Sequence, residues 1–559
     1  MQKIILSILV FAYGAMTAVA QSNSTTSVGC NTPTAQKTIT NGRLSANLLN
    51  AGDGFHSLQG KAKFFPDNVN FPGVATLYAS SLWLSAYDSN GDLCLAAQTY
   101  RQTNGDYFAG PLSAAGTVSS ADCTNYDRIW SVTSADINAV ISDYNDNGVI
   151  NNAIPTNILG YPCRNNANFQ ALFGFSLPAN TNFAPFKDRN NNGNYEPNLG
   201  DYPIIPNTAG QTVPAQMAFC VFNDQGNGQF HNQSRGGKAL KAEIQATFYT
   251  LNSTVPFVQS TLFVSYNITN KSGDTLTDTY ATIWTDADLG CYNDDYLGTS
   301  PPNNTIYAYN ATNTDYFPCP TSDGSVLLGF GSHTPTQAVT FLNKSMDKSL
   351  YCLSNFFEQP LNMNINIPLR YRQTMTGELY WAPTSHIYTD APSVPNGWSM
   401  LTEQATYRDY QLYGSTNKGA WLPNESFTLD VMYSYHTSTT PLATASVDTM
   451  LIEVPALQGY YNSGFTVLPN VVHPVTATQT QAALYGTRVF PNPATDQLYI
   501  DLGAQTRATA LLTDAAGRLI RTETLTAAQT KIDIATLPQG LYLLTLQIDG
   551  AQVTHKMVK

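Results

Sequence analysis

The stretch "SSLWLSAYDSNGDLCLAA", residues 80–97, carries the clearest local signal for the fold. Two apolar segments flank the pair Asn90-Gly91, and Asn-Gly is the strongest short-range signal for a tight β-hairpin turn. The stretch therefore predicts two adjacent antiparallel strands.

Two further segments alternate apolar and polar residues with a period of two. They are "LFVSYNIT", residues 262–269, and "FTLDVMYSYHTS", residues 427–438. This period is typical of half-buried β-strands. We expect a mainly β protein whose body is an antiparallel β-sandwich, built as one unit or as two subdomains. His436 falls on the less apolar face of its strand and is interpreted as a polar surface residue.

One helix is predicted in the body, within "TSADINAVISDY". Ser134 is the expected N-cap, and Asp136 in the first turn lies near the positive end of the helix dipole. Ile137, Val140 and Ile141 form an apolar stripe, which we interpret as a packing face rather than a partner site.

The first twenty residues have the pattern of a secretory signal peptide. Lys3 precedes the short apolar segment "IILSILVFA", and "AVA" at 18–20 is a small-x-small cleavage pattern. The alternative, a membrane anchor, is disfavoured because the apolar segment is too short to span a bilayer comfortably. We expect a signal peptide at 1–20 and a β-rich secreted body at 21–465, with no membrane span.

The C-terminal end predicts a small all-β module, residues 486–559. Its strands are expected within "VFPNPATDQLYIDL" (489–502), "LLTDAAGRLIRTETL" (511–525) and "LPQGLYLLTLQIDGAQVTHKMVK" (537–559). In the last of these, Asp549-Gly550 is a hairpin signal. Residues 466–485 have no clear periodicity and are rich in Thr, Val and Pro, which indicates a linker.

Four motifs of this module occur in the order of a known family: "FPNP", "D-x-x-G-R", "L-x-x-G-x-Y" and the closing "HKMVK". The module resembles the C-terminal sorting domain (type A) of the type IX secretion system of Bacteroidetes. The resemblance implies a small β-sandwich that the outer-membrane translocon recognises and that a surface sortase usually removes. It also implies a secreted or outer-membrane-associated cell-surface protein, and it gives an address rather than an activity.

Parts of the body are similar to uncharacterised exported Bacteroidetes proteins that carry the same domain. The similar stretches are residues 77–112, 186–203 and 283–298. This resemblance supports the grouping but implies no mechanism.

Composition limits the choice of partners. Charged residues make up 12% of the chain, and the formal net charge is −12. An acidic chain does not favour nucleic acid or anionic lipid, since both require clustered Lys and Arg. It fits cation binding, which requires carboxylate oxygens.

The eight cysteines are an even number in a chain expected to fold in an oxidising compartment, so we expect disulfides. Buried free thiols are the alternative for some of them. A zinc site is not expected, because the chain has no C-x-x-C pair, and the sequence leaves the pairing open.

The segment "FKDRNNNGNYEPNLGDYP", residues 186–203, contains the first half of a calcium loop. Oxygen-bearing side chains occupy positions 1, 3 and 5, Gly193 permits the sharp turn at position 6, and a backbone carbonyl follows at position 7. Position 12 is Leu199 instead of the usual Glu, so we expect Asp201 to close the shell. The predicted ligands of a structural Ca²⁺ are Asp188, Asn190, Asn192, Asn194 and Asp201. The alternative is an Asx-rich turn without an ion.

A second copy of this pattern lies in "DYNDNGVI" at Asp143, Asn145, Asn147 and Gly148. Its position 12 is Ile154, and no carboxylate follows nearby. We interpret it as a helix terminus closed by an Asn-Gly turn.

A third acidic segment is "WTDADLGCYNDDYLG". Trp284, Asp286 and Asp288 share one face if the segment is a strand, and paired carboxylates beside an aromatic ring are typical of glycosidases. Asp294 and Asp295 crowd the same segment, which favours a structural metal site or a hydrogen-bonded loop. The usual motifs of zinc hydrolases, serine hydrolases and nucleotide-binding enzymes do not occur.

Together these patterns favour an exported structural or adhesion-type β-protein stabilised by calcium and disulfides over an enzyme, and they leave catalytic activity open. Surface glycans or other cell-surface proteins are its expected partners, beside the translocon and the sortase. The alternative is a secreted polysaccharide hydrolase that uses paired carboxylates near Trp284. The sequence leaves the ligand, the oligomeric state, and anchoring versus release open.

Overall fold

The computed structural model describes most of the chain. The described residues are 29–101, 105–226, 237–316, 319–320, 326–353, 367–378, 384–469, 471, 487–503, 505–514, 518–548 and 551–559. The predicted signal peptide, residues 1–20, lies outside them, as does most of the predicted linker. The described chain is mainly β, as the alternating patterns predict.

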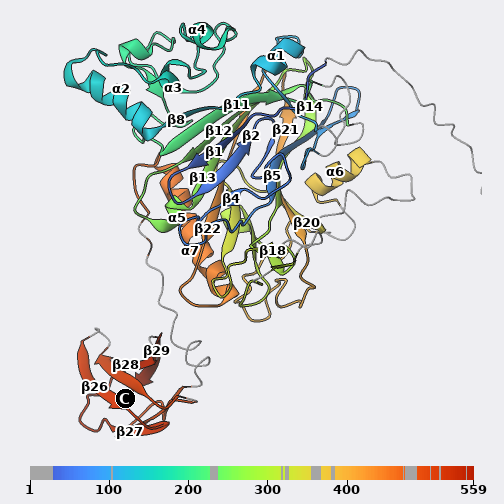
Figure 1. The fold of residues 1–559 in the computed structure, drawn as a ribbon. Coiled ribbons are helices and arrows are strands. Elements are labelled where there is room, and N and C mark those ends of the chain that lie inside the picture. The colour runs from blue at the N-terminus through green and yellow to red at the C-terminus, as the bar shows by residue number, and fades with distance from the viewer. Residues whose placement is uncertain are drawn as a thin grey trace, which may run out of the picture.

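Two nine-stranded antiparallel sheets build the body (Figure 1). The first sheet has the strand order β1-β2-β3-β5-β14-β21-β20, with β4 on β2 and β6 on β5. Its strands are β1 (Gln36–Thr40), β2 (Ser45–Leu49), β3 (Asp53–Gly54), β4 (Phe64–Phe65), β5 (Ala79–Tyr87), β6 (Leu93–Ala96), β14 (Leu276–Asp286), β20 (Lys348–Leu353) and β21 (Tyr410–Trp421). Strands β5 and β6 are the hairpin predicted around Asn90-Gly91.

The second sheet has the order β15-β16-β19-β22-β13-β12-β11-β7, with β8 on β11. Its strands are β7 (Phe108–Ala109), β8 (Trp130–Thr133), β11 (Gln216–Asn223), β12 (Ala242–Thr250), β13 (Thr261–Asn270), β15 (Asp295–Ser300), β16 (Thr305–Asn310), β19 (Thr336–Phe341) and β22 (Ser426–His436). The two segments predicted from their period-two alternation are β13 and β22, which pair with each other.

The two sheets pack face to face around one large core. Leu82 and Leu84 of β5 are fully buried in this core, together with Tyr433 of β22. Polar and aromatic contacts cross between the sheets: the hydroxyl oxygens of Ser80 and Tyr433 lie 2.9 Å apart, and the rings of Phe55 and Tyr433 lie 4.8 Å apart. The predicted antiparallel sandwich is therefore confirmed.

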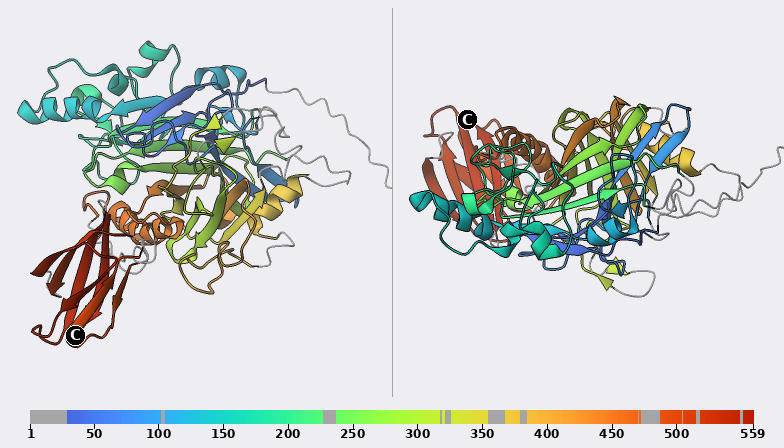
Figure 2. Two further views of the ribbon diagram at one scale, coloured as in Figure 1. Left: turned by 60° about the horizontal axis from the view of Figure 1, so that its bottom comes forward. Right: turned by 90° about the horizontal axis from the view of Figure 1, so that it is seen from above.

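The outer face of the first sheet is also buried. Trp83 and Trp284 point away from the inter-sheet core and are fully buried beneath helix α6 (Ile367–Thr376), drawn in yellow in Figures 1 and 2. Met375 of α6 packs in the same cluster, and Arg372 donates a 2.6 Å hydrogen bond to the hydroxyl of Ser85. The central strands are thus covered on both faces rather than half-buried, because the chain adds a layer that the strand patterns do not encode.

Helix α7 (Ala443–Asn462) covers the outer face of the second sheet, where Val454 packs in the same core as Met432. His436 is 1% exposed; its Nδ1 lies 2.6 Å from Oε2 of Glu453 on α7, and its Nε2 lies 2.8 Å from the hydroxyl of Ser434. The interpretation of His436 as a surface residue is therefore wrong, because α7 buries the polar face of β22.

A helical layer leads from β8 to the predicted calcium loop. The remaining helices of the described residues are α1 (Ser120–Asn125), α2 (Ser134–Asn147), α3 (Thr156–Leu159), α4 (Phe169–Phe173) and α5 (Pro256–Gln259). Helix α2 is the predicted helix, and Ile137 and Val140 are buried as expected. Its N-cap is Thr133 rather than Ser134, and Thr133 forms a reciprocal capping box with Asp136.

The C-terminal module has its own core. Leu498, Ile500, Leu544 and Leu546 lie at its centre (red in Figure 1). Its two antiparallel sheets are β23 (Arg488–Phe490), β24 (Gln497–Asp501) and β27 (Gln529–Asp533), and β26 (Leu519–Leu525), β25 (Ala508–Asp514), β28 (Leu541–Ile548) and β29 (Ala551–Val558). Strands β28 and β29 form the predicted terminal hairpin.

Candidate metal sites

A short two-stranded stem holds the predicted calcium loop. Strands β9 (Phe186–Lys187) and β10 (Tyr202–Pro203) pair antiparallel on either side of it. Tyr195 anchors the centre of the loop, because it is almost fully buried and donates a 2.9 Å hydrogen bond to the carbonyl of Ile158. The loop is therefore a fixed element of the fold.

The predicted ligands turn their side-chain oxygens towards the loop backbone. Oδ2 of Asp188 accepts a 2.7 Å hydrogen bond from the amide of Gly193. Oδ1 of Asn190 accepts from the amide of Asn192, and Oδ1 of Asn192 accepts from the amide of Asn194. An ion-free Asx turn and a calcium loop share these bonds. Within the described part of the chain, no group donates a hydrogen bond to the buried Oδ1 of Asp188.

Asp201 closes the loop from its C-terminal side. It is fully buried, and its two oxygens accept hydrogen bonds from the amides of Arg189 (2.9 Å) and Glu196 (2.8 Å). Burial raises the pKa of the Asp201 carboxyl above its ordinary value, although these amides oppose the shift, and the charges of Asp188 and Glu196 add to it. Three carboxyl groups therefore interact within this loop.

Glu196 is a loop residue that the sequence analysis did not include. Its Oε2 accepts hydrogen bonds from the side-chain amides of Asn190 (3.1 Å) and Asn192 (2.6 Å). It stands at position 9 counted from Asp188, a position that often contributes to calcium loops, and this offset was the available signal. Asn194 departs from the rest, because its side-chain oxygen accepts from Asn165 outside the loop.

The second Asp-Asn-Asn-Gly pattern is the C-terminus of α2. Gly148 is the left-handed C-cap, with φ 81°. Asp143 accepts hydrogen bonds from the amides of Asn151 (2.9 Å) and Asn152 (3.0 Å). The interpretation as a helix terminus is confirmed.

A second group of carboxylates lies at the end of β14. One carboxylate oxygen each from Asp286, Asp288 and Asp409 lies within 4.8 Å of the others. The hydroxyl of Tyr100 donates to Asp286. Burial, together with the charge of Asp409, raises the pKa of Asp288 to about 8. Asp409 was missed because only the pairing of β14 with β21 brings it to the other two.

Trp284 does not offer its ring to a ligand. It is fully buried, stacks on Trp83 at a centroid distance of 6.1 Å, and donates from Nε1 to Oε1 of Gln411. The structure therefore gives Trp284 a packing role instead of the sugar platform that the hydrolase alternative requires.

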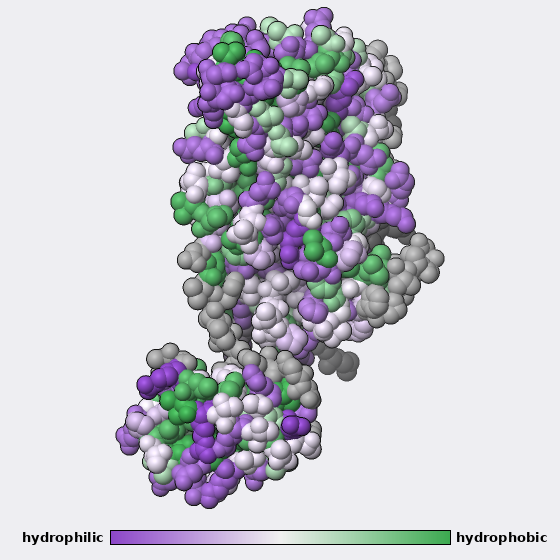
Figure 3. All heavy atoms as spheres, turned by 60° about the vertical axis from the view of Figure 1, so that its left-hand side comes forward, coloured by the Kyte–Doolittle hydropathy of each residue, from purple (hydrophilic) through white to green (hydrophobic). Residues whose placement is uncertain are grey.

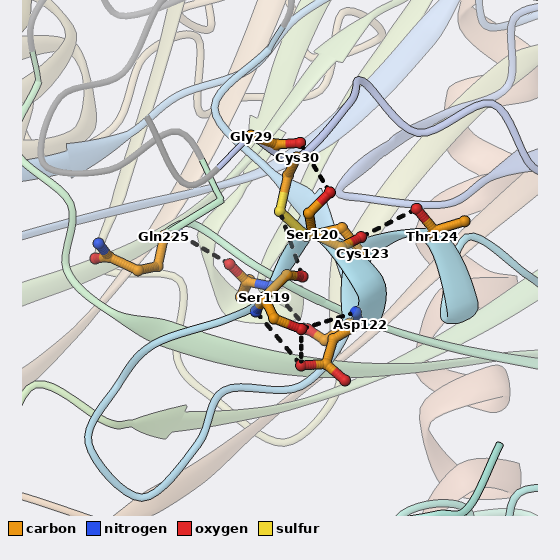
Figure 4. The surroundings of a disulfide bond; sticks show 10 residues. Gly29, Cys30, Ser119, Ser120, Asp122, Cys123, Thr124 and Gln225 are labelled. Atoms are coloured by element: carbon orange, nitrogen blue, oxygen red, sulfur yellow. Dashed lines mark hydrogen bonds between the residues drawn. A yellow bond between two sulfur atoms is a disulfide. The ribbon is translucent and has the colours of Figure 1, made fainter. Parts of the chain in front are cut away.

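Both expected states of cysteine occur. Cys30 pairs with Cys123 at the start of the described chain, beside the capping box of α1 at Ser119 (Figure 4). Cys291 pairs with Cys319. The remaining four, Cys94, Cys163, Cys220 and Cys352, are buried free thiols.

The C-terminal module consists of one three-stranded and one four-stranded sheet, and the resemblance implies a small β-sandwich. Residues 488–559 match the family described as the secretion system C-terminal sorting domain. The module is a type IX secretion sorting domain. The sorting domain marks the chain for export to the cell surface or the extracellular space, and it implies contact with the secretion machinery. Within the described residues, no helix is both long and apolar enough to cross a membrane.

Two solved structures are similar to the chain at low identity. A polysaccharide lyase is 8% identical over 56% of this chain and 34% of its own, with a TM-score of 0.18. PorZ, described as an essential surface component of the type IX secretion system of Porphyromonas gingivalis, is 11% identical over 64% of this chain and 45% of its own, with a TM-score of 0.13. The chain thus spans less than half of either protein. No curated protein matches it.

Proposed function

We propose that the exported body is a non-enzymatic cell-surface or extracellular protein that attaches to glycans or to other surface proteins, and that a structural Ca²⁺ orders its 188–201 loop. The buried, donor-free Oδ1 of Asp188 carries the calcium part of this proposal. Buried polar atoms are nearly always paired, so an oxygen left without a donor indicates a missing partner. A cation on this oxygen would also compensate the repulsion among Asp188, Glu196 and Asp201.

An aromatic surface supports the attachment part. Trp398 is 37% exposed. The ring of Trp398 lies 5.6 Å from that of Tyr388, which in turn lies 5.7 Å from that of Tyr351. Trp and Tyr supply large, rigid contact areas at a low cost in conformational entropy. On the face drawn in Figure 3, apolar residues form small patches among hydrophilic ones.

The calcium proposal predicts a loss of calcium-dependent stability in Asp188→Ala. At concentrations well above an extracellular-type Kd, Ca²⁺ should stabilise the wild type by about 1–3 kcal/mol. Asp188→Ala should lose the part of this increment that the 188–201 loop contributes, because it removes the buried oxygen that is proposed to bind the ion. Thermal unfolding in excess Ca²⁺ and in excess chelator measures the difference.

The matched control is Asp143→Ala in the second Asp-Asn-Asn-Gly pattern. This change removes the acceptor for two amides and should lower the melting temperature equally with and without Ca²⁺. Equal calcium increments in the wild type and in Asp188→Ala would contradict the loop site.

The attachment proposal predicts that Trp398→Ala weakens glycan binding by about tenfold or more, the loss expected for a central aromatic anchor. Affinity electrophoresis of the full chain in gels containing different cell-wall and plant polysaccharides measures binding, and reducing-end release from the same polysaccharides measures hydrolysis. Retardation that Trp398→Ala reduces, without reducing-end release, supports attachment. Reducing-end release would favour the hydrolase alternative.

A further inference from the structure

A second buried polar cluster lies at the edge of the second sheet, where β15 begins and β16 ends. It consists of Asp294, Asp295 and Asn310, which are all fully buried. The strand register pairs Asp295 with Asn310. Directly opposed residues of an antiparallel pair have Cβ atoms about 4.5–5.5 Å apart on the same face. The two polar side chains therefore stand side by side.

These side chains leave several atoms without partners. Oδ2 of Asp294 accepts a 3.1 Å hydrogen bond from the amide of Tyr316, and Oδ2 of Asp295 accepts a 3.0 Å bond from the amide of Leu289. Among the residues that the structure describes, no group forms a hydrogen bond with the buried Oδ1 of either aspartate or with the two buried side-chain amide atoms of Asn310. Buried polar atoms are nearly always paired, so this group of unpaired oxygens points to a bound species.

The charge in this region points to the same conclusion. Asp315 is also fully buried and accepts from the amides of Cys291 and Phe330. Among the described residues, no Lys or Arg forms an ion pair with these carboxylates. Buried charges are normally paired or coordinate metals.

We propose that Asp294, Asp295 and Asn310 form a buried site for a divalent, oxygen-preferring cation such as Ca²⁺. The free carboxylate oxygens of Asp294 and Asp295 supply two charged ligands, and the free amide oxygen of Asn310 supplies a neutral one. Asp315 supplies further negative charge nearby. Water completes the shell and accepts from the amide nitrogen of Asn310. Zinc does not fit, because the nearby sulfur atoms of Cys291 and Cys319 are joined in a disulfide.

The surrounding backbone is built to hold this arrangement. A Cβ added to Gly290 would come within 2.2 Å of Oδ2 of Asp315, and one added to Gly329 within 2.9 Å of the same atom. Gly290 has a φ of 71°, a conformation that favours glycine. The disulfide fastens the loop before Asp294 to the segment after Asp315. The cation therefore joins the start of β15 to the end of β16.

Asp295→Asn tests the proposal because its effect on the melting temperature should have opposite signs in excess chelator and in excess Ca²⁺. In excess chelator the variant should melt at a higher temperature than the wild type, because a neutral amide replaces a buried, repelled carboxylate. In excess Ca²⁺ it should melt at a lower temperature, because it has lost a charged ligand. After equilibration with Ca²⁺ and desalting, the Asp295→Asn protein should also retain one Ca²⁺ per chain fewer than the wild type. Elemental analysis of the full chain measures this number.

The same measurements in Asp188→Ala separate this site from the 188–201 loop. The double variant, Asp188→Ala with Asp295→Asn, should lose one more Ca²⁺ than either single variant. The experiment can therefore reject one site without rejecting the other. Asn310→Asp provides a second change: it should lower the melting temperature in chelator and increase the increment that Ca²⁺ gives. An unchanged calcium count in Asp295→Asn, or an unchanged increment in Asn310→Asp, would mean that only water fills the cluster and would overturn the proposal.

Discussion

Replacing Asp53 by alanine is expected to lower the free energy of unfolding by about 3–5 kcal/mol, the usual cost of breaking a buried ion pair. Asp53 is almost fully buried and lies 2.6 Å from Nη2 of Arg101, whose side chain is only 5% exposed. His56 (3.0 Å) and Gln98 (2.7 Å) also contact the carboxylate. The change leaves the Arg101 guanidinium buried without its counter-charge. Urea unfolding at neutral pH, followed by tryptophan fluorescence, measures the loss.

Asp92→Ala is the matched control, because Asp92 also pairs with a basic residue but its side chain is 61% exposed. Exposed ion pairs contribute roughly 0–1 kcal/mol, so this variant should unfold close to the wild type. Equal losses of unfolding free energy in Asp53→Ala and Asp92→Ala would contradict the expectation that burial makes the Asp53–Arg101 ion pair costly to break.

The Asp53 network also predicts how stability depends on pH. Burial raises the pKa of Asp53, but Arg101 and His56 more than offset it, so that the pKa falls below the ordinary value of 3.8. A depressed carboxyl pKa stabilises the fold above the ordinary value and loses this contribution as the pH falls through the folded-state pKa. Below pH 4 the wild type should therefore lose more stability than Asp53→Asn, and urea unfolding across this range measures the difference.

The local β pattern was readable in the sequence, but the covering layers were not. Asn90-Gly91 predicted its hairpin because turn geometry depends on adjacent residues. The burial of His436 depends on α7, whose sequence is apolar nearly all round and carries Pro455, so it lacks the one-sided stripe that marks a surface helix. A polar strand face that packs against a helix and a polar strand face that is exposed to solvent show the same period-two alternation in the sequence.

The candidate sites differ in the same way, because some consist of residues close in the sequence and others of residues that only strand pairing brings together. The 188–201 loop could be proposed as a calcium site from the sequence because its predicted ligands are local and follow a fixed spacing. Asp409 could not be linked to Asp286, because their approach is set by the pairing of β14 with β21. Asn310 likewise meets Asp295 only through strand register. Sequence spacing locates loops that fold on themselves, whereas tertiary pairing assembles the other clusters.

Replacing Trp284 by alanine is expected to lower the free energy of unfolding by about 3–5 kcal/mol, the usual cost of truncating a buried aromatic residue. Its ring stacks on Trp83 and meets Tyr100 edge-on at a centroid distance of 5.1 Å. The indole N–H also donates to Gln411, whose side-chain oxygen loses this donor. Differential scanning calorimetry of the full chain measures the effect.

Trp398→Ala is the control for this last change, because Trp398 is 37% exposed and should cost far less stability. The pair of variants separates packing from ligand contact. Trp284→Ala should unfold early, and its glycan binding should be intact at temperatures where it remains folded, whereas Trp398→Ala should melt like the wild type and bind weakly. A Trp284→Ala variant that melted like the wild type but lost activity towards a polysaccharide would place Trp284 in a catalytic cleft, and the attachment proposal would then give way to the hydrolase.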